Sequence, residues 1–389
     1  MNLLRSAALL AAGLTLVSCG GATAPAPTPA GSAAAQSAAA AKPATSTAAA
    51  APASPAASAK PAGSAQASAA ASAAAKPAAT TEIRIGQIPS TAAAPFFVPT
   101  EDGTFASRGL KVSITPVTDT AQTMIQIAGG QLEMGTVTLG AAALNAFARG
   151  TDMTIIASGG IDPPGHGAFA PVVVRSDLMD SGKVKTLADL KGLKVALNAR
   201  GVILEYSLYR ALKLGGLTLN DVDVVTMPWP DMVAAMSNKN LDVGLIGNPL
   251  AAQAVAKGVG KILSDDYAPN NQNSTVTVNS KWLQSHRDAA VTFLEVYLQT
   301  IRKLADGGLK REPQAMAIIE KATKTPVDVI QLAPDPTWPK DGKINVQSIE
   351  DQQSYFFTTK ALTYSQPLDI NKLIDYGPLD QALKNIGAK

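Results

Sequence analysis

Cysteine and histidine, which serve as thiol nucleophiles, zinc ligands and proton carriers near neutral pH, are rare in this sequence. A single cysteine, Cys19, and two histidines, His166 and His286, are spread over 389 residues. One cysteine cannot form an internal disulfide, and there is no CxxC motif or Cys/His cluster with the spacing of a zinc site. GxSxG, HExxH and GKS/GKT motifs are also missing from the sequence. We therefore expect a protein that is not an enzyme and that uses no metal and no cofactor.

Cys19 lies at the end of a targeting signature. Arg5 supplies a positive charge, and the apolar run from Ala7 to Val17 is much shorter than the roughly 20 residues that span a bilayer. The LVSC tetrapeptide at 16–19 resembles the lipobox of bacterial lipoproteins. This resemblance implies that residues 1–18 are a signal peptide and that Cys19 is lipidated, which anchors the chain to a membrane of the cell envelope outside the cytoplasm. The alternative is an ordinary secretory signal with an incidental cysteine.

Residues 19–81 are rich in Ala, Pro and Ser, and from residue 20 onward they contain no aromatic residue and no Leu, Ile or Val. Such a segment cannot bury enough apolar surface to offset the entropy lost on ordering, so we interpret it as a disordered linker. The alternative interpretation is a partly helical tail with no role.

Charge and hydropathy exclude two kinds of partner for the remaining chain. The four basic residues of the first 81 account for more than the net charge of +3, which leaves −1 for residues 82–389. No basic block is present, so nucleic acid is not an expected partner. No apolar run of about 18 residues follows the signal, so no later membrane span is expected.

Hydrophobic patterning from Glu82 to Asn279 alternates short β-rich runs with helical periodicity. This alternation predicts α/β lobes built on parallel strands with right-handed crossovers. One helix is predicted from Pro95 to Gly109, and the chain is mainly helical after Asn279. About 308 residues are enough to form two hydrophobic cores, so two lobes with a helical C-terminal part are the simplest packing. The predicted strands are 82–88, 111–117, 132–137, 153–158, 171–175, 194–199, 223–228, 241–247, 260–266 and 274–279.

In open α/β sheets, ligands bind at the carboxyl ends of the strands, where loops lead into helix N-termini that suit anions. In the loop after the first strand, Ser90 and Thr91 offer hydroxyls and Phe96 offers a flat face, although either hydroxyl can instead cap its own helix. After the third strand, Thr136 and Thr138 are candidates, with Thr138 also predicted to cap the next helix.

The second half of the alternating region contributes further candidates. Asn198 offers a donor, and Arg200 offers a charged fork for a sulfonate, phosphate or carboxylate, or is simply an exposed arginine. Trp229, between two prolines, suits a stacking wall or hinge packing. Asp231 is a polar candidate that is also predicted to be the N-cap of its helix.

Several stretches in a fixed order carry a resemblance to one family. These are AAAPFFVPTEDGTFASRGLKV, GGQLEMGTVTLGAAALNAFARG, LADLKGLKVAL, LDVGLIGNPLAAQA and DGKINVQSIEDQQSYF. Together they resemble the nitrate/sulfonate/taurine and thiamine-pyrimidine type of ABC-transporter solute-binding proteins over nearly all of 82–389. Relatives commonly carry an acid before the proline that corresponds to Pro249. This chain has Asn248 there, which we include among the ligand-binding residues and which argues against a cationic group.

The resemblance implies an α/β, two-lobe periplasmic-binding-protein-like (type II) fold with a hinge and an interlobe cleft. It places lobe 1 at 82–170 plus 275–389 and lobe 2 at 171–274. The expected function is capture of a small organic solute, sulfonate-like or heteroaromatic, by a monomer that serves an ABC permease and ATPase. The alternatives are an enzyme of the same fold similar to thiamine-pyrimidine synthases, and a binding protein of another transporter class.

Overall fold

The computed structural model describes residues 80–165 and 167–387. The predicted signal peptide 1–18, the lipidation site Cys19, His166 and nearly all of the predicted linker 19–81 lie outside the described residues. Thr81, the last residue of the predicted linker, already belongs to the first β-strand, where it pairs with Leu110 of the neighbouring strand.

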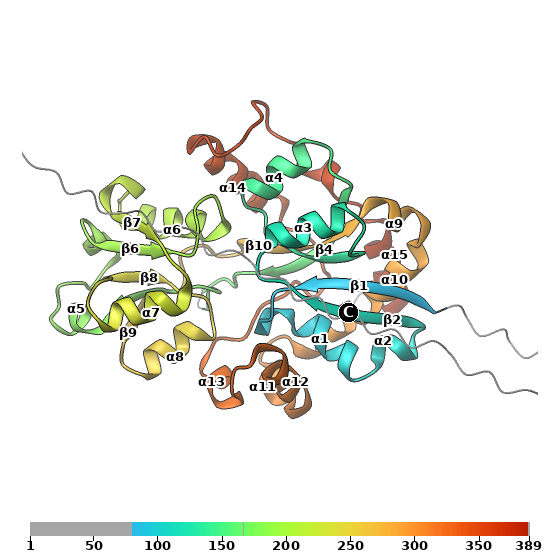
Figure 1. Ribbon diagram of the computed structural model, residues 1–389, viewed down its shortest axis with the longest axis horizontal. Helices are drawn as coiled ribbons and strands as arrows, with labels where there is room; N and C mark the ends of the chain where they lie inside the picture. Colours follow the sequence, from blue (N-terminus) through green and yellow to red (C-terminus); the bar gives the residue numbers. More distant parts are fainter. Residues whose placement is uncertain (1–79, 166, 388–389) are drawn as a thin grey trace, which may run out of the picture. The chain divides into compact units, whose positions relative to one another are not determined.

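In the part of the chain that the structure describes, ten strands form two separate five-stranded sheets (Figure 1). We call the first sheet and the helices packed on it lobe 1, and the second sheet with its helices lobe 2. The first sheet has the order β2-β1-β3-β10-β4, with β1 (Thr81–Gln87), β2 (Leu110–Pro116), β3 (Met134–Val137), β4 (Met153–Ile161) and β10 (Gln272–Asn279). The second has the order β7-β6-β8-β5-β9, with β5 (Val172–Arg175), β6 (Lys194–Leu197), β7 (Asp223–Thr226), β8 (Val243–Leu245) and β9 (Gly260–Ser264).

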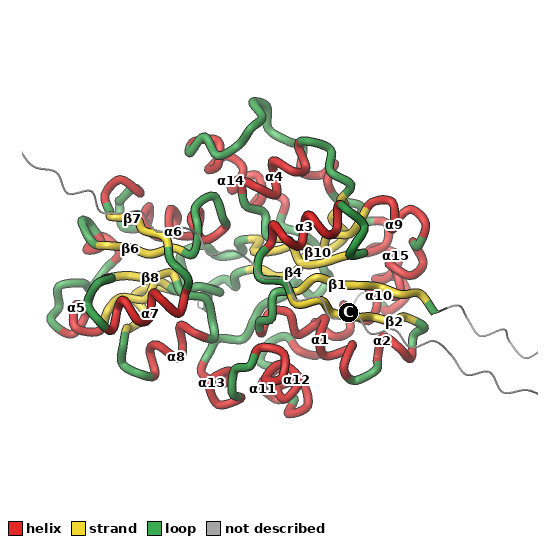
Figure 2. Tube along the Cα trace, viewed as in Figure 1, coloured by secondary structure: helices red, strands yellow, loops and turns green. Residues whose placement is uncertain are grey.

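Helices connect and cover these strands, and Figure 2 shows them as red segments between yellow strands. Their bounds are α1 (Ala94–Glu101), α2 (Thr104–Ser107), α3 (Thr120–Ala128), α4 (Ala141–Ala148), α5 (Ser176–Asp180), α6 (Ile203–Leu214), α7 (Trp229–Ser237), α8 (Leu250–Ala256), α9 (Ser280–Ser285), α10 (Arg287–Leu304), α11 (Gly308–Arg311), α12 (Pro313–Thr323), α13 (Val327–Leu332), α14 (Val346–Thr358) and α15 (Gly377–Ile386). Short 3₁₀ helices are η1 (Thr91–Ala93), η2 (Leu187–Leu190), η3 (Leu219–Asp221) and η4 (Ile370–Leu373).

The strands match the predicted runs closely. The prediction that all strands are parallel is wrong for two strands, β5 and β10. β10 is antiparallel to both β3 and β4, and β5 is antiparallel to both β8 and β9. The physical reason is the path of the chain, which enters lobe 2 through β5 and returns to lobe 1 through β10. Each returning strand therefore runs against the strands that the helices connect.

The single helix predicted between Pro95 and Gly109 is also wrong. The structure has two helices, α1 and α2, separated at Asp102 and Gly103. Gly103 adopts a φ of +81°, which a residue with a Cβ rarely takes. The Asp102 carboxylate then accepts a hydrogen bond from the Thr104 backbone N–H at 2.9 Å, which begins the second helix.

Two of the buried clusters lie on opposite faces of the first sheet. One contains Phe96 of α1, Phe105 of α2 and Phe293 of α10, and the other contains Ile127 of α3 and Leu144 of α4. Figure 1 shows α3 and α4 on one side of this sheet and α1 and α2 on the other. The second cluster continues without interruption into residues of lobe 2, so the two sheets share part of one apolar core.

Two chain segments, 162–171 and 265–271, connect the sheets and are hydrogen-bonded to each other. The backbone N–H of Asp162 donates to the Asn271 carbonyl at 2.9 Å, and the Asn270 N–H donates to the Asp162 carbonyl at 3.0 Å. The Asp162 side chain, 3% exposed, accepts from the Phe169 N–H at 3.0 Å, from Asn273 Nδ2 at 2.9 Å and from Asn271 Nδ2 at 3.2 Å. One buried carboxylate therefore joins both crossing segments.

Burial raises the pKa of Asp162 above its usual value of 3.8, and the hydrogen bonds from Asn273, Phe169 and Asn271 offset only part of that rise. An acid whose pKa is higher in the folded state contributes stability that is fully present below 3.8 and is lost as the pH rises through the folded-state pKa.

The variant Asp162→Asn should lower the free energy of unfolding by about 2 kcal/mol at neutral pH, because its amide sets a second donor against Asn271 Nδ2. The wild-type advantage should grow as the pH falls toward 3.8, because the native carboxyl, whose pKa is raised, takes up its proton before the carboxyl of the unfolded chain does. Urea denaturation across this pH range measures both effects. Asp266→Asn, at an exposed position of the same crossing, should change stability by less than about 0.5 kcal/mol. A wild-type advantage that shrinks in acid would contradict the assignment.

Candidate functional site

Loops at the carboxyl ends of the parallel strands contain most of the residues that the sequence suggested for ligand binding. The loop after β1 leads through η1 into α1, and its Ser90 is half-buried without capping the helix through its side chain. Thr91 is 5% exposed. Phe96 is 1% exposed, with ring centroids 5.3 Å from Tyr297 and 6.2 Å from Phe293. The prediction that Phe96 offers a face to a ligand is wrong, because its ring is part of the lobe 1 core.

The threonines after β3 are already hydrogen-bonded within lobe 1. Thr136 Oγ1 exchanges hydrogen bonds with the Gln87 side chain at 2.7 and 2.9 Å. Thr138 Oγ1 lies 2.8 Å from the Thr120 hydroxyl. The N-cap of α4 is Gly140, without a side-chain cap, so the prediction that Thr138 caps this helix is wrong.

The loop after β6 is organised by a carboxylate that the sequence analysis did not single out. Glu205, 6% exposed in the first turn of α6, accepts from Arg200 Nη1 at 2.8 Å and from the Gly201 N–H at 2.7 Å. Arg200 Nη2 also donates to the Val224 carbonyl at 3.2 Å. The free charged fork predicted for Arg200 is therefore not observed, because Glu205 and Val224 engage it. Asn198, by contrast, is exposed.

Trp229, at the start of α7, lies beside the first crossing segment. Its ring meets Phe169 edge-on at 5.9 Å, and a Cβ at Gly247 would approach the indole to 2.5 Å. Trp229 Nε1 is buried and has no hydrogen-bond partner among the residues described. Asn248 is 8% exposed, and its backbone N–H donates to the Phe169 carbonyl at 2.9 Å. The structure thus brings Trp229, Asn248 and the crossing segment together.

Asp231 does not cap α7, contrary to the prediction. The N-cap is Pro228, and Asp231 is an exposed residue of the first helical turn. A carboxylate there still interacts favourably with the helix N-terminus. Phe169 is a residue of this neighbourhood that sequence reasoning missed, and no pattern around it distinguishes it from other loop aromatics.

A cluster of tyrosines forms a contact between the lobes, where α6 of lobe 2 packs against α14, which itself packs on lobe 1. The Tyr355 ring lies 5.6 Å from Tyr206 and 4.7 Å from Tyr209. Gln352 of the same helix donates to the Gln272 carbonyl of β10 at 2.9 Å, which ties α14 to the first sheet. The Tyr355 hydroxyl is buried without a partner among the described residues, and burial raises the pKa of this phenol. The spacing of the two tyrosines on α6 was visible in the sequence, but their partner on α14 was not.

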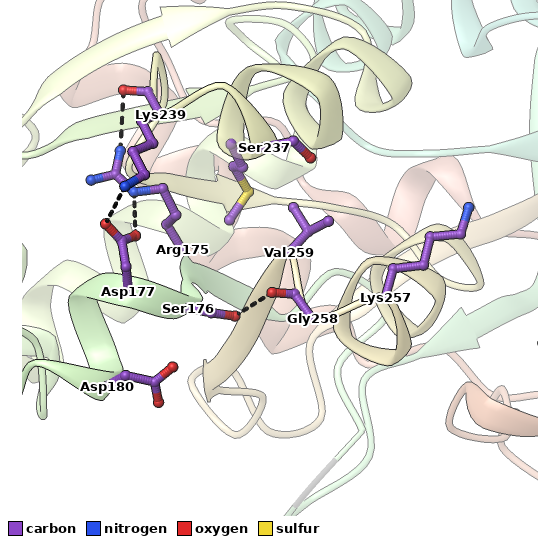
Figure 3. Close-up of a pocket in the computed structure, with 10 residues that line it drawn as sticks. Arg175, Ser176, Asp177, Asp180, Ser237, Lys239, Lys257, Gly258 and Val259 are labelled. Carbon is purple, nitrogen blue, oxygen red and sulfur yellow. Dashed lines mark hydrogen bonds and ion pairs between the residues drawn. The ribbon is translucent and has the colours of Figure 1, made fainter.

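Lobe 2 also has a pocket of about 440 Å³ that is separate from these loops, and Figure 3 shows the residues that line it. Arg175 lines it, with Nε 2.6 Å from Asp177 Oδ1 and Nη1 3.1 Å from the Lys239 carbonyl. Arg175 pairs with Gly260, the first residue of β9, so the pocket lies at the amino ends of β8 and β9. The candidate loops are at the opposite edge of the sheet, so we do not assign this pocket to the site.

Residues 76–318 match the model of the NMT1-like family. The chain belongs to this family. The putative aliphatic sulfonates-binding protein of Escherichia coli (strain K12) is 26% identical over 250 residues, which are 62% of this chain and 74% of that protein.

Solved structures of similar fold include two binding proteins. The periplasmic nitrate-binding protein NrtA from Synechocystis PCC 6803 matches with a TM-score of 0.65 at 17% identity, over 80% of this chain and 90% of NrtA. The alkanesulfonate-binding protein SsuA from Xanthomonas axonopodis pv. citri, bound to MOPS, matches with a TM-score of 0.60 at 18% identity, over 77% of this chain and 99% of SsuA. The predicted two-lobe type II periplasmic-binding-protein fold is confirmed. The desulfurization enzyme DSZB shares it more distantly, with a TM-score of 0.53 at 15% identity over 78% of this chain and 99% of DSZB. Within residues 80–387, apart from position 166, no helix combines the length and apolar character needed to cross a bilayer.

The unpartnered Tyr355 hydroxyl predicts an unusual effect of its removal. Tyr355→Phe keeps the ring contacts and removes a buried polar atom without a partner, so the free energy of unfolding should rise by about 1 kcal/mol. Tyr297→Phe is the matched control, because its buried hydroxyl donates to the Ser158 carbonyl at 2.8 Å and its loss should cost about 1 kcal/mol. Urea titration of the two variants should give shifts of opposite sign, and shifts of equal sign would show that Tyr355 has a partner after all.

Proposed function

We propose that this protein is an extracytoplasmic, lipid-anchored solute-binding protein that delivers a small organic solute to the permease and ATPase of an ABC importer. The observation that carries the proposal is the pairing of two α/β lobes by two crossing segments, with candidate loops at the carboxyl ends of strands in both lobes. Membership of the NMT1-like family and the names of the related binding proteins support it.

The mechanism is capture by hinge closure. The two lobes, expected at 82–170 plus 275–389 and at 171–274, move about the crossing segments that Asp162 joins, with the whole of β10 from Gln272 onward assigned to lobe 1. The permease recognises the closed form, and the solute leaves chemically unchanged. The protein acts as a monomer.

The solute class we propose is an organic sulfonate or a related oxyanion, with a flat heteroaromatic as the second choice. Arg200 is engaged by Glu205, so recognition falls to neutral groups near the crossing segment and on the loops. The buried Trp229 Nε1–H is a donor without a partner among the described residues, which suits an acceptor oxygen of a solute. The hydroxyls and amides of Ser90, Thr91, Asn198 and Asn248 complete the proposed set.

A thermal-shift screen of the purified chain against alkanesulfonates, nitrate and thiamine-type pyrimidines tests the function. A true solute at 100 times its dissociation constant should add about 2.7 kcal/mol of stability. Mass spectrometry of the recovered solute should find it unaltered, whereas a converted product would favour an enzyme of this fold. No shift with any member of the screen would refute the proposed solute classes.

Substitution of Trp229 tests its role in recognition. Trp229→Phe removes the unpartnered N–H while keeping an aromatic ring beside Phe169, so the dissociation constant of the best solute should rise about tenfold. Trp282→Phe is the control, because Trp282 lies on α9 of lobe 1 and stacks on His286 instead. Isothermal titration calorimetry compares the two variants, and equal affinities would exclude Trp229 from the site.

The lipid anchor is tested separately at Cys19. The full chain produced in a bacterium that processes lipoproteins should sediment with membranes, and the mature protein should begin at Cys19 with acyl chains in its intact mass. Cys19→Ala should leave the chain in the soluble fraction, whereas Ser18→Ala, which keeps the thiol, should not. Membrane association that survives Cys19→Ala would contradict lipidation at this residue.

A further inference from the structure

A backbone hydrogen bond connects the two lobes directly. The N–H of Ala141, the first residue of α4 in lobe 1, donates to the carbonyl of Gly201 in lobe 2 at 2.9 Å. Both partners are main-chain groups of this protein. The contact therefore needs no side chain and no added molecule to form.

The approach of the two loops is close enough to require a glycine. A Cβ placed on Gly140 would lie 2.7 Å from the Gly201 carbonyl oxygen and 3.1 Å from Val202 Cα. Gly140 has a φ of −77°, which any residue adopts, so its own backbone conformation does not demand glycine. The missing side chain instead makes room for lobe 2.

The Gly201 carbonyl is presented by a loop that is held rigidly from its own lobe. Glu205 receives the Gly201 N–H at 2.7 Å and Arg200 Nη1 at 2.8 Å, and Arg200 reaches the Val224 carbonyl on β7. Charge-assisted hydrogen bonds of this kind are stronger than neutral ones, so the loop keeps one orientation.

Aromatic packing joins α6 to α14, which also lies against α4. Tyr355 of α14 lies against Tyr206 and Tyr209 of α6, and Tyr355 and Tyr206 are 5% and 2% exposed. Aromatic pairs at these separations stabilise beyond the area that they bury. The backbone contact and the tyrosine cluster together form a continuous seam between the lobes.

We propose that this seam is a built-in latch, in which Gly140, Gly201 and the Tyr355 cluster hold the lobes closed before any solute binds. The inference rests on the proposed function in one respect, since it assigns the closed form a role in solute capture. Because the same contacts are present when the closed form holds a solute, they favour closure in the free and in the solute-bound protein alike. Glu205 is a positioning residue of the latch, because it acts through the Gly201 loop.

Distance measurement between the lobes tests the latch without any solute. In the full chain with Cys19→Ser, spin labels at Gln131→Cys in lobe 1 and Asn238→Cys in lobe 2 occupy exposed positions outside the seam. Pulsed electron–electron double resonance of the solute-free wild type should give predominantly one short distance between the two labels. Gly140→Ala should shift most molecules to a longer distance, because its methyl group cannot fit against Gly201 and Val202.

Matched variants separate opening of the latch from misfolding. Gly129→Ala is the control, since Gly129 has a φ of −80° at the end of α3 and its Cβ would lie 3.2 Å from the Ile125 carbonyl of its own helix. Gly129→Ala should leave the distance unchanged. If Gly140→Ala fails to fold, Glu205→Gln provides the second test, because weaker pairing with Arg200 frees the loop and should populate the longer distance in part.

Hydrogen exchange at the Ala141 amide gives an independent readout. The amide should exchange slowly in the wild type and in Gly129→Ala, and at least tenfold faster in the variant that opens the seam. Identical distances and exchange in the wild type and the seam variants, or a solute-free wild type with only the longer distance, would overturn the latch. Because no solute is used, a chain that latches but binds no member of the screen refutes the proposed solute class and leaves the latch standing.

Discussion

The structure depends on the way in which one chain crosses twice between two sheets. The first strand after each crossing is antiparallel to its neighbours. This strand is β5 in the second sheet and β10 in the first. The crossings are held to each other by buried residues such as Tyr267, whose hydroxyl donates to the Ala170 carbonyl at 2.7 Å, and by the Asp162 carboxylate. A buried carboxylate is costly unless donors surround it, and here donors from both crossings do so. Asp162 therefore makes two segments that are about 100 residues apart in sequence behave as one hinge.

Most polar groups at the carboxyl ends of the strands are engaged by the chain itself. Gln87 pairs with Thr136, Thr120 pairs with Thr138, and Glu205 pairs with Arg200. This internal pairing holds the loops in fixed positions, which lowers the conformational entropy that the protein loses when a ligand binds. It also removes the one obvious cation from the candidate set. The recognition that we propose therefore relies on shape and on neutral donors rather than on a salt bridge.

The seam between α4, α6 and α14 connects hinge geometry to function. Two-lobe proteins of this kind work by a balance between open and closed forms, and that balance is set by every contact that exists in only one of them. Main-chain contact at Gly140 and the tyrosine cluster around Tyr355 exist only when the lobes meet. Under the proposed latch, a solute adds to a closure that the protein's own contacts already favour, instead of supplying all of it.

The sequence by itself determined the local elements of this protein. Alternation of β-branched runs with helical periodicity located the ten strands to within a few residues, because strand and helix patterns depend on neighbours along the chain. The order of the motifs was enough to identify the two-lobe fold and the family. Tertiary structure alone decided which strands reverse, since direction depends on a return path that no local pattern encodes. It also decided which side chains are buried and which are paired within the protein. Phe96 became core because α10 covers it, and Arg200 forms an ion pair because the buried Glu205 lies in the first turn of α6, directly after the Arg200 loop. The partners Phe169, Tyr355 and Asp162 could not be found in advance, because their roles arise from contacts between residues that are distant in sequence.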